Sequence, residues 1–336
     1  MQFLTQREKS SLVFLITGAL IATIITIYLG VNIQQMNEDI LSNKIHVIHT
    51  GGEIEENFRK KYQHNMGKYN INSYKPLMNS SEIVPKDWNI IAEDIGRKYN
   101  NYDAFVIVCG RDTLVYTASA LAFMMENLTK PIILTDGDVN SAVRLSSKTK
   151  IPEVMIASGG KLLRGCRTVH KSSHLFTSPN YPQLEVRNCL QFPTEPPHIK
   201  FINPKINIIV VKIFPGMTAS YFLNLINANV QGIVLEMYCG VGNAPTSEKF
   251  LDTIKVLAKK GVVILAVSQC DEISDYDVDI RLLEAGVLSG YDMTTPAAYA
   301  KLSFLLSNVE NKKLIGQLME KSFRGEMIEL EKTITK

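Results

Sequence analysis

A short turn in the first half of the chain carries residue types that catalysis or binding could use. Residues 105–108 form an apolar run, and Cys109-Gly110-Arg111-Asp112-Thr113 follows directly, before a long apolar pattern that reaches residue 128. A glycine-containing turn between a buried strand and a helix presents backbone N–H groups and short side chains at the carboxyl edge of a sheet, where open α/β sheets bind ligands. The same turn also fits a simple connection in which Asp112 caps the helix. Both interpretations stay open at this point.

The composition limits the kinds of protein and partner to be considered. The 336 residues are 46% hydrophobic and 21% charged, which is enough for one large or two medium-sized domains. The net charge of +3 is spread along the chain, so we expect no nucleic-acid partner. Five cysteines without metal-ligand spacing lead us to expect neither a disulfide framework nor a zinc site. The triplets that begin at Asn79 and Asn127 match the glycosylation sequon, which often arises by chance.

An uncharged stretch near the amino terminus, residues 11–33, is long enough to cross a bilayer, which takes roughly 20 residues. It has neither the short apolar core and small-residue exit of a cleavable signal peptide nor the polar stripe of a buried helix. We therefore predict a tail over residues 1–10 and a single membrane anchor over residues 11–33. Arg7 and Lys9 precede the stretch, which favours a lumenal or extracellular globular part over a cytoplasmic one.

The globular part alternates apolar strands with helical patterns. Strands are predicted over residues 44–49, 70–74, 104–109, 131–135, 153–157, 206–212, 232–237 and 262–267. Such alternation predicts parallel sheets with helices on both faces. Four prolines between residues 189 and 204 indicate a linker, because proline lacks a backbone donor and restricts φ. We therefore predict an α/β fold of two domains, over residues 44–190 and 206–325, joined by a linker over residues 191–205.

Five segments together resemble a known family. They are Thr50-Gly51-Gly52-Glu53-Ile54, Pro76-Leu77-Met78-Asn79-Ser80-Ser81-Glu82, Gly110-Arg111-Asp112-Thr113, Gly240-Val241-Gly242-Asn243-Ala244-Pro245 and Asp292-Met293-Thr294-Thr295. In this order they resemble the bacterial-type L-asparaginases, especially the cytoplasmic subgroup. The resemblance runs from about Lys44 to the last helical patterns and is most specific over residues 76–95 and 116–135. It implies an asparaginase-like fold of two α/β domains with mainly parallel sheets.

The resemblance also implies a chemistry. The family hydrolyses the side-chain amide of asparagine, sometimes of glutamine, without a metal or organic cofactor. A threonine in a T-G-G-T-I turn attacks the amide, and a second threonine, in G-T-D-T, works with the adjacent aspartate and a later lysine. Acyl transfer of this kind needs a nucleophile, a base and donors for the oxyanion. By this resemblance, the residues that hold the amino acid, asparagine or aspartate, are Gly52, Ser80, Ser81, Asp112 and Asn243.

The sequence departs from the family pattern at the reacting groups. Glu53 stands at the first threonine position and Arg111 at the second, while Asp112 is kept and Lys171 matches the catalytic lysine only with a shift of one place. A carboxylate is a poor nucleophile for an amide, because the anhydride that forms re-expels the amine, and an arginine does not act as a base near neutral pH. Because the two replacements carry opposite charges, we expect Glu53 and Arg111 to pair across the old cavity. The alternative is that both side chains point into solvent.

Three functions therefore stay open. The first is an asparaginase-family protein that no longer hydrolyses asparagine and binds an amino acid or a partner protein. The second is a working amidase with rearranged chemistry that uses Glu53, Asp112 and either His170 or Lys171. The third is a purely structural membrane protein. The retained substrate-holding residues favour the first function. The resemblance also implies a homo-oligomer, or a hetero-oligomer with an active paralogue.

Overall fold

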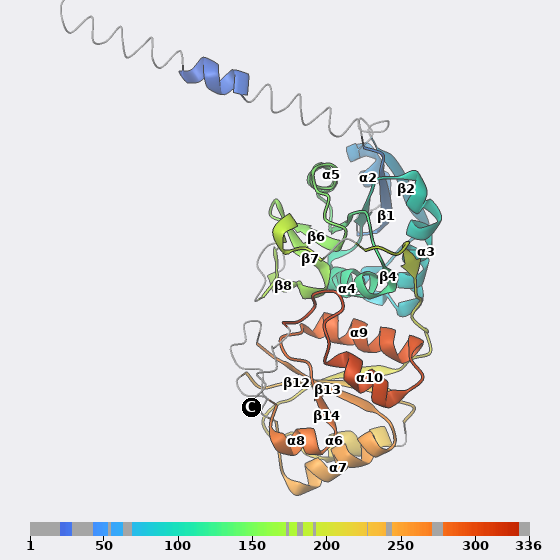
Figure 1. Cartoon of the computed structure of the whole chain (residues 1–336), viewed down its shortest axis with the longest axis vertical. Coiled ribbons are helices and arrows are strands. Elements are labelled where there is room, and N and C mark those ends of the chain that lie inside the picture. The colour runs from blue at the N-terminus through green and yellow to red at the C-terminus, as the bar shows by residue number, and fades with distance from the viewer. Residues whose placement is uncertain are drawn as a thin grey trace, which may run out of the picture.

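The structure is a computed structural model with two lobes, one above the other in Figure 1. The upper lobe contains the first domain, and the lower lobe contains the second. The residues that the structure describes are 21–28, 43–52, 55–62, 69–172, 175–179, 184–190, 193–226, 228–239, 244–270 and 278–328.

A six-stranded sheet forms the centre of the first domain, with the strand order β2-β1-β3-β5-β6-β7. The strands are β1 (Ile45–Gly51), β2 (Asn70–Met78), β3 (Ala104–Val108), β5 (Ile132–Thr135), β6 (Val154–Ser158) and β7 (Lys161–Arg164). All neighbouring strands run parallel except β7, which pairs antiparallel with β6. Every residue of β1, β3 and β5 is buried, so these strands form the middle of the sheet.

Helices cover both faces of this sheet. The helices α3 (Pro85–Lys98) and α4 (Leu114–Met124) pack on one face, and α2 (Glu55–Tyr62) and α5 (Val139–Lys148) pack on the other. Alternate residues of β3 join the two cores: Phe105 and Ile107 lie on the α4 side, and Val106 and Val108 on the α5 side. The unbroken apolar run in this strand follows from burial on both faces.

Shorter elements complete the first domain and the connection to the second. They are the strands β4 (Met125–Glu126), β8 (Val169–Ser172), β9 (Leu175–Thr177) and β10 (His198–Ile199), and the 3₁₀ turns η2 (Ser80–Glu82), η3 (Tyr99–Asn101), η4 (Arg111–Thr113), η5 (Gly165–Arg167) and η6 (Val186–Asn188). The strands β8 and β9 form an antiparallel pair. β10, within the connection, pairs antiparallel with β4 and so holds the connection against the first domain.

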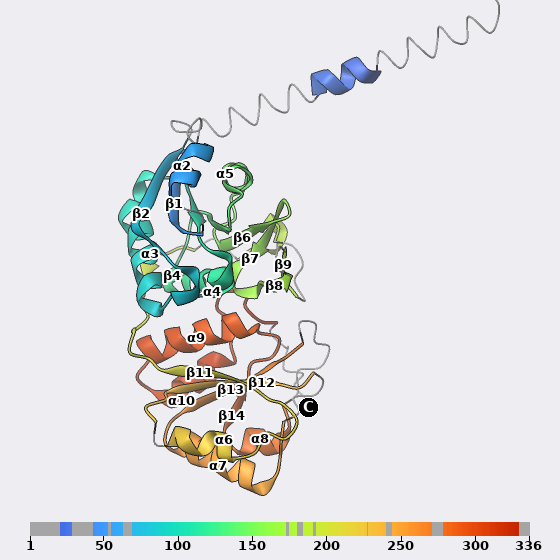
Figure 2. The same ribbon diagram turned by 180° about the vertical axis from the view of Figure 1, so that it is seen from behind.

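The second domain contains a four-stranded parallel sheet with the order β11-β12-β13-β14. Its elements are β11 (Ile208–Lys212), α6 (Ser220–Leu223), η7 (Asn224–Ile226), β12 (Gly232–Met237), α7 (Glu248–Lys259), β13 (Val263–Ser268), α8 (Ile280–Glu284), β14 (Val287–Ser289), α9 (Thr295–Asn308) and α10 (Lys312–Met319). Figure 2 shows α6, α7 and α8 on the face away from the first domain and α9 between the sheet and the first domain. The predicted two-domain α/β fold with mainly parallel sheets is confirmed.

The two domains share one hydrophobic core at their junction. Buried residues of α4 and α9 belong to a single cluster, in which the rings of Phe123 and Phe304 lie 6.3 Å apart. The ring of Tyr299 on α9 makes edge contacts with Trp88 and Tyr116 of the first domain, at 6.2 and 6.0 Å. Because apolar surface of both domains is removed from water at this junction, it stabilises the two lobes as one body.

The predicted membrane-spanning helix over residues 11–33 is wrong, and with it the predicted single-pass membrane localisation and the lumenal or extracellular placement. In that stretch the structure describes a helix over residues 21–28 only, and no helix in the described part of the chain is long and apolar enough to cross a bilayer. Hydropathy reports only that a stretch is apolar, whereas a membrane span also requires roughly 20 helical residues to cross about 30 Å of hydrocarbon.

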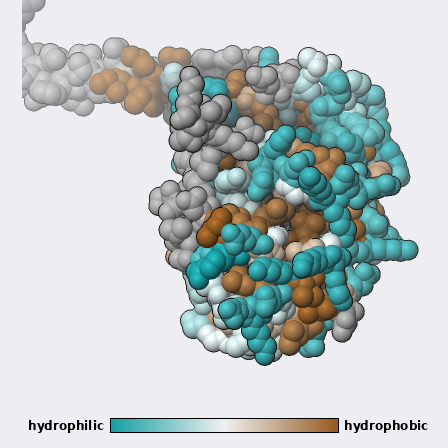
Figure 3. Space-filling view, turned by 60° about the horizontal axis from the view of Figure 1, so that its bottom comes forward, coloured by the Kyte–Doolittle hydropathy of each residue, from teal (hydrophilic) through white to brown (hydrophobic). Residues whose placement is uncertain are grey.

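The outer face of the second domain mixes polar and apolar side chains. Figure 3, in which the bottom of the molecule comes forward, shows hydrophobic side chains distributed among hydrophilic ones. Tyr221 and Leu223 of α6 and Ile280 of α8 are among the exposed apolar residues. Scattered exposed apolar residues are normal on a protein surface, so this face does not by itself indicate a function.

A buried histidine lies at the start of the first sheet. His46 in β1 is 1% exposed, its ring stacks on Tyr102 at 4.6 Å, and its Nε2 lies 3.0 Å from the Lys98 ammonium. Burial, together with the positive charge of Lys98, lowers the pKa of His46 from 6.5 to about 4, although the nearby Asp94 opposes this shift. The folded protein therefore keeps this imidazole neutral at pH values where the unfolded chain binds a proton.

We expect the free energy of unfolding to fall as the pH decreases from about 6.5 to about 4, because only the unfolded state gains a proton at His46 in that range. The loss is on the order of 1–2 kcal/mol after allowance for solvent screening. Urea unfolding at several pH values measures it. A His46→Gln variant should lose this part of the pH dependence, whereas a variant of the exposed His198, His198→Gln, should keep it. Equal pH dependence in both variants would contradict the assignment.

Candidate functional site

The candidate site lies where the strand order of the first sheet changes direction. From β1 the chain moves to β2 on one side, and from β3 it moves to β5 on the other, so β1 and β3 are neighbours whose following loops diverge. In open α/β sheets a crevice forms outside the carboxyl ends of two such strands and binds ligands. Gly52 follows β1 and Gly110 follows β3, so the sequence-predicted turn is at this crevice.

Two glycines allow the loops after β1 and β3 to approach each other closely. Gly52 has a φ of +95°, and a Cβ there would lie 3.1 Å from the Gly110 nitrogen and the Cys109 carbonyl oxygen. A Cβ on Gly110 would collide with the side chain of Ser80, which lies in η2 after β2. Because neither glycine has a side chain, the loops that follow β1, β2 and β3 can lie close together.

Hydrogen bonds hold the polar residues of these loops in one cluster. The Ser80 hydroxyl donates to Oδ2 of Asp112 at 2.6 Å, and the Thr113 hydroxyl donates to the Ser80 carbonyl oxygen at 2.7 Å. Asp112 is otherwise exposed, so its carboxylate can accept hydrogen bonds from a ligand cation such as an α-ammonium group. Ser81 lies beside this cluster, where its hydroxyl and N–H donate to the side chain of Asn79 at 3.0 and 3.3 Å.

Arg111 makes an ion pair that the sequence did not indicate. Its Nε and Nη2 both lie 2.5 Å from Oδ2 of Asp136, which directly follows β5. The two side chains are 37% and 20% exposed, so the pair is partly accessible to solvent at the carboxyl edge of the sheet. In the sequence, Asp136 is recognisable only as a carboxylate directly after an apolar run. Its proximity to Arg111 can be expected only when the order of the strands in the sheet is known.

Other sequence-predicted residues lie elsewhere or outside the described residues. Lys171 is exposed on β8, in the β8–β9 pair, and within the described part of the chain it makes no hydrogen bond or ion pair with Asp112. His170 packs against Phe176 at 4.8 Å. Glu53 and Asn243 are outside the described residues, so the predicted Glu53–Arg111 pair and the predicted role of Asn243 stay predictions.

A second cavity, of about 260 Å³, lies between the two domains. Tyr116 of α4, Glu236 at the end of β12 and Thr295 at the start of α9 are among the residues that line it, together with His170 of β8. The Thr295 hydroxyl donates to Oε1 of Glu236 at 2.7 Å. Burial, and next the Glu236 carboxylate, raises the pKa of Tyr116, so this phenol stays protonated at neutral pH.

A disulfide bond forms part of the wall of this interdomain cavity. Cys239 follows β12, Cys270 follows β13, and the two are bonded, with Cα atoms 5.3 Å apart. The expectation that no disulfide forms is therefore wrong for this pair. The residues are 31 positions apart in sequence, and only the parallel pairing of β12 with β13 brings their carboxyl ends together. Cys109 and Cys166 are free and buried, and Cys189 is free and half-buried.

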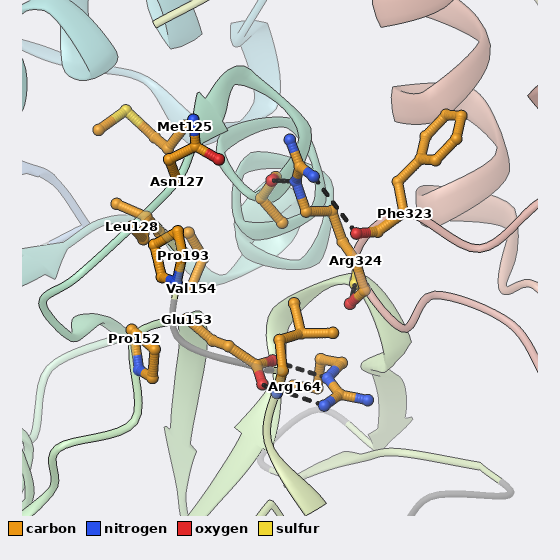
Figure 4. Close-up of a pocket in the computed structure, with 13 residues that line it drawn as sticks. Met125, Asn127, Leu128, Pro152, Glu153, Val154, Arg164, Pro193, Phe323 and Arg324 are labelled. Carbon is orange, nitrogen blue, oxygen red and sulfur yellow. Dashed lines mark hydrogen bonds and ion pairs between the residues drawn. The ribbon is translucent and has the colours of Figure 1, made fainter. Parts of the chain in front are cut away.

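A third cavity, also of about 260 Å³, is lined by charged side chains that make structural contacts with other groups of the protein. Figure 4 shows Arg164 and Glu153 facing each other on one side of it and Arg324 on the other. The Arg164 Nε and Nη2 donate to the two carboxylate oxygens of Glu153 at 2.7 and 3.0 Å, and both side chains are at most 5% exposed. The Arg324 Nε donates to the Ala122 carbonyl oxygen at 2.9 Å, which ties the C-terminal segment to α4. Each of these charged side chains makes structural contacts within the protein.

The described residues contain no group of three or more histidine, cysteine, aspartate or glutamate side chains that could hold a metal ion. The loops after β1, β2 and β3 instead contain a carboxylate, hydroxyls, backbone N–H groups and an arginine that is in an ion pair. This set can bind a small zwitterion. Within the described residues it does not combine a free nucleophilic hydroxyl with a base.

Comparison with known proteins identifies the family. The family model described as "Asparaginase, N-terminal" matches residues 43–196, and "Glutaminase/Asparaginase C-terminal domain" matches residues 207–319. L-asparaginase 1 of Escherichia coli strain K12 is 36% identical over 293 residues, covering 78% of this chain and 86% of that protein. A 60 kDa lysophospholipase of Mus musculus is 32% identical over 293 residues, 77% of this chain but 51% of its own length.

Solved structures agree with this assignment. The crystal structure of L-asparaginase I from Vibrio cholerae aligns with a TM-score of 0.77 at 33% identity, covering 85% of this chain and 99% of that one. The thermostable L-asparaginase from Thermococcus kodakarensis aligns with a TM-score of 0.72 at 26% identity, covering 85% and 99%. Both family models, the sequence relatives and the shared two-domain fold lead to one conclusion: the chain belongs to the asparaginase family.

Proposed function

We propose that this asparaginase-family protein binds asparagine or aspartate in the crevice after β1 and β3 and hydrolyses the side-chain amide poorly or not at all. The observation that carries the proposal is the ion pair between Arg111 and Asp136, 2.5 Å long, at the position where the family resemblance expects the second reactive threonine. A guanidinium has no lone pair with which to accept a proton and stays charged near neutral pH. Arg111 therefore cannot relay a proton from a nucleophile.

The loss of one reacting group affects the whole reaction. Nucleophile, base and oxyanion donors act as a unit, so removal of one member costs about as much as removal of several. Glu53 at the other threonine position offers a carboxylate instead of a hydroxyl. Of the two candidate bases, Lys171 is exposed on β8 and makes no hydrogen bond or ion pair with Asp112 in the described part of the chain, and the His170 ring packs against Phe176. These features support binding without efficient turnover.

The binding part of the proposal depends on Asp112, whose carboxylate is held by Ser80 at 2.6 Å. We expect Asp112→Ala to weaken asparagine binding by about 10- to 100-fold, because a charge-assisted hydrogen bond contributes about 1.5–3 kcal/mol. Isothermal titration calorimetry with L-asparagine and L-aspartate measures this. Glu82→Ala, which removes a different carboxylate that lies in η2, is the matched control and should bind like the unmodified protein. Equal affinity of the Asp112 variant would refute this site.

The absence of turnover is tested by ammonia release from asparagine. The unmodified protein should release no ammonia above the uncatalysed rate, and a Glu53→Thr/Arg111→Thr double variant, assayed in parallel, tests whether the scaffold regains activity. The second candidate function is a working amidase, which the 36% identity to an L-asparaginase favours. Ammonia release by the unmodified protein that disappears in Asp112→Ala would overturn our proposal in favour of that function.

The family resemblance also supports self-association. We therefore also propose that the chain forms a homo-oligomer, or a hetero-oligomer with a paralogue. Light scattering on the purified chain tests for the homo-oligomer. If light scattering shows only monomers, the homo-oligomer is ruled out.

A further inference from the structure

We propose that Cys239 and Cys270 form a redox-modification site, which small or protein dithiols reduce and reoxidise while the protein stays folded. The proposal concerns the second domain and holds whether or not the crevice in the first domain hydrolyses an amide. It is based on three observations: the exposure of Cys239, the hydrogen bonds that hold the ends of β12 and β13 together independently of the disulfide, and the position of Cys270 in the wall of the interdomain cavity.

The disulfide can be reached from solvent. Cys239 is exposed and Cys270 is half-buried, whereas the free Cys109 and Cys166 are buried among apolar residues. Burial raises the pKa of both buried thiols to about 12, so they have almost no thiolate at neutral pH and cannot attack the disulfide. Burial also raises the pKa of the third free thiol, the half-buried Cys189, so we assign the attack to an external thiol, for which the exposed Cys239 sulfur is the accessible target.

Backbone and amide hydrogen bonds keep the two cysteines close without the covalent bond. The residue before Cys270, Gln269, donates its N–H to the Met237 carbonyl oxygen at 2.9 Å, and its side-chain amide donates to Ile213 and Glu236 carbonyl oxygens at 2.7 and 2.8 Å. The Cys270 N–H donates to the Ser268 hydroxyl at 2.9 Å. These bonds connect the carboxyl ends of β11, β12 and β13, so the thiols of the reduced form stay near each other and can rejoin.

The exchange is a balanced two-electron reaction. One thiolate of the external dithiol attacks a sulfur of the pair, the S–S bond breaks, and the departing cysteine sulfur keeps the electron pair and takes up a proton. The second thiol of the reductant then closes its own disulfide and releases the other cysteine as a thiol. A dithiol of the thioredoxin type or dithiothreitol supplies both electrons, and oxidised glutathione drives the reverse direction.

The location of the pair gives the reaction a local consequence. Cys270 lines the interdomain cavity together with Gln269, Ser268 and Glu236. Reduction removes the covalent tie between the ends of β12 and β13 and so loosens that side of the cavity, while the first domain, which is built on a separate sheet, is unaffected.

Differential alkylation of the native full chain tests the proposal. The protein is equilibrated with mixtures of reduced and oxidised dithiothreitol, free thiols are trapped with an alkylating reagent, and peptides are analysed by mass spectrometry. We expect Cys239 and Cys270 to change together from bonded to doubly alkylated, with an unchanged far-UV circular dichroism spectrum. Hydrogen exchange should become at least about tenfold faster at the ends of β12 and β13 and stay unchanged in β1 and β3. Oxidised glutathione should restore the bond.

Matched variants make the outcome decisive. Cys189→Ser removes the half-buried free thiol and should leave the transition unchanged, whereas Cys239→Ser should leave Cys270 open to alkylation in every redox mixture. The proposal is overturned if both cysteines are alkylated in the oxidised protein, if they resist millimolar dithiothreitol until the chain is denatured, or if reduction unfolds the second domain. It is also overturned if reduction leaves the hydrogen exchange of β12 and β13 unchanged.

Discussion

Asp292→Ala is expected to lower the free energy of unfolding by about 3–5 kcal/mol, because it removes the carboxylate that forms a buried ion pair with the guanidinium of Arg167. Asp292 and Arg167 are 5% and 2% exposed and form an ion pair between the two domains, with Nη1 of Arg167 in contact with Oδ2 of Asp292. The other carboxylate oxygen accepts the Ile328 N–H at 2.7 Å, and the Arg167 Nε donates to the Gly325 carbonyl oxygen at 2.6 Å. The variant therefore disturbs both domains and the C-terminal segment at once.

Urea unfolding followed by circular dichroism measures this loss. An Asp292→Asn variant keeps the shape and one acceptor oxygen, so it should be destabilised less than the alanine variant. The exposed pair of Glu93 with Arg97 on α3 supplies the control: Glu93→Ala removes a carboxylate from an arginine in the same way, but at the surface, and should leave the unfolding midpoint nearly unchanged. Equal destabilisation by the buried and the exposed variants would contradict the role assigned to burial.

Lys301→Met is the second substitution with a large expected effect, again about 3–5 kcal/mol of destabilisation. Lys301 of α9 is fully buried, and its Nζ lies 2.7 Å from Oε1 of the equally buried Glu326. The same ammonium donates to the Met319 carbonyl oxygen at 2.9 Å. Methionine fills similar space but leaves the Glu326 carboxylate without a cation. The N–H groups of Phe323 and Arg324 still donate to that carboxylate at 3.0 and 2.7 Å, as does the Ser322 hydroxyl at 3.4 Å, but these neutral donors do not replace the lost positive charge.

A double-mutant cycle separates the pair from its surroundings. Lys301→Met/Glu326→Leu removes both charges and should recover a large part of the stability that either single variant loses, because replacement of a buried ion pair by apolar residues is often close to neutral. The measurement is again chemical unfolding of all four proteins. If the double variant loses as much as the two single variants added together, the two charges are not coupled and our explanation fails.

The fold was largely predictable because its strands follow simple patterns. The run from Ala104 to Val108 is apolar at every position, and in the structure its side chains alternate between the α4 and α5 sides of the sheet. The family resemblance, rather than the strand pattern alone, placed Gly52, Ser80 and Asp112 in one site, and parallel strands place their carboxyl ends at one edge of the sheet. Their contacts in the structure follow from that rule.

Features that depend on strand order could not be predicted from the sequence. The partner of Arg111 is Asp136, which lies 25 residues later and becomes its neighbour only because β5 is next to β3. Cys239 and Cys270 each end an apolar run, and nothing in their spacing indicates that β12 and β13 are adjacent. The membrane prediction failed for a different reason: it rested on hydropathy alone, and no helix in the described part of the chain is long and apolar enough to cross a bilayer.

The segment over residues 320–328 has a consequence for how the chain is made. It supplies the Glu326 carboxylate to Lys301 of the second domain and the Gly325 carbonyl oxygen to Arg167 of the first. The ribosome adds residues 320–328 after the residues of both sheets, so a chain that ends at residue 319 contains Asp292 but lacks the Glu326 carboxylate and the Gly325 carbonyl oxygen. We therefore expect a chain truncated at residue 319 to leave these buried cations incompletely satisfied and to be a substrate for chaperones and proteases.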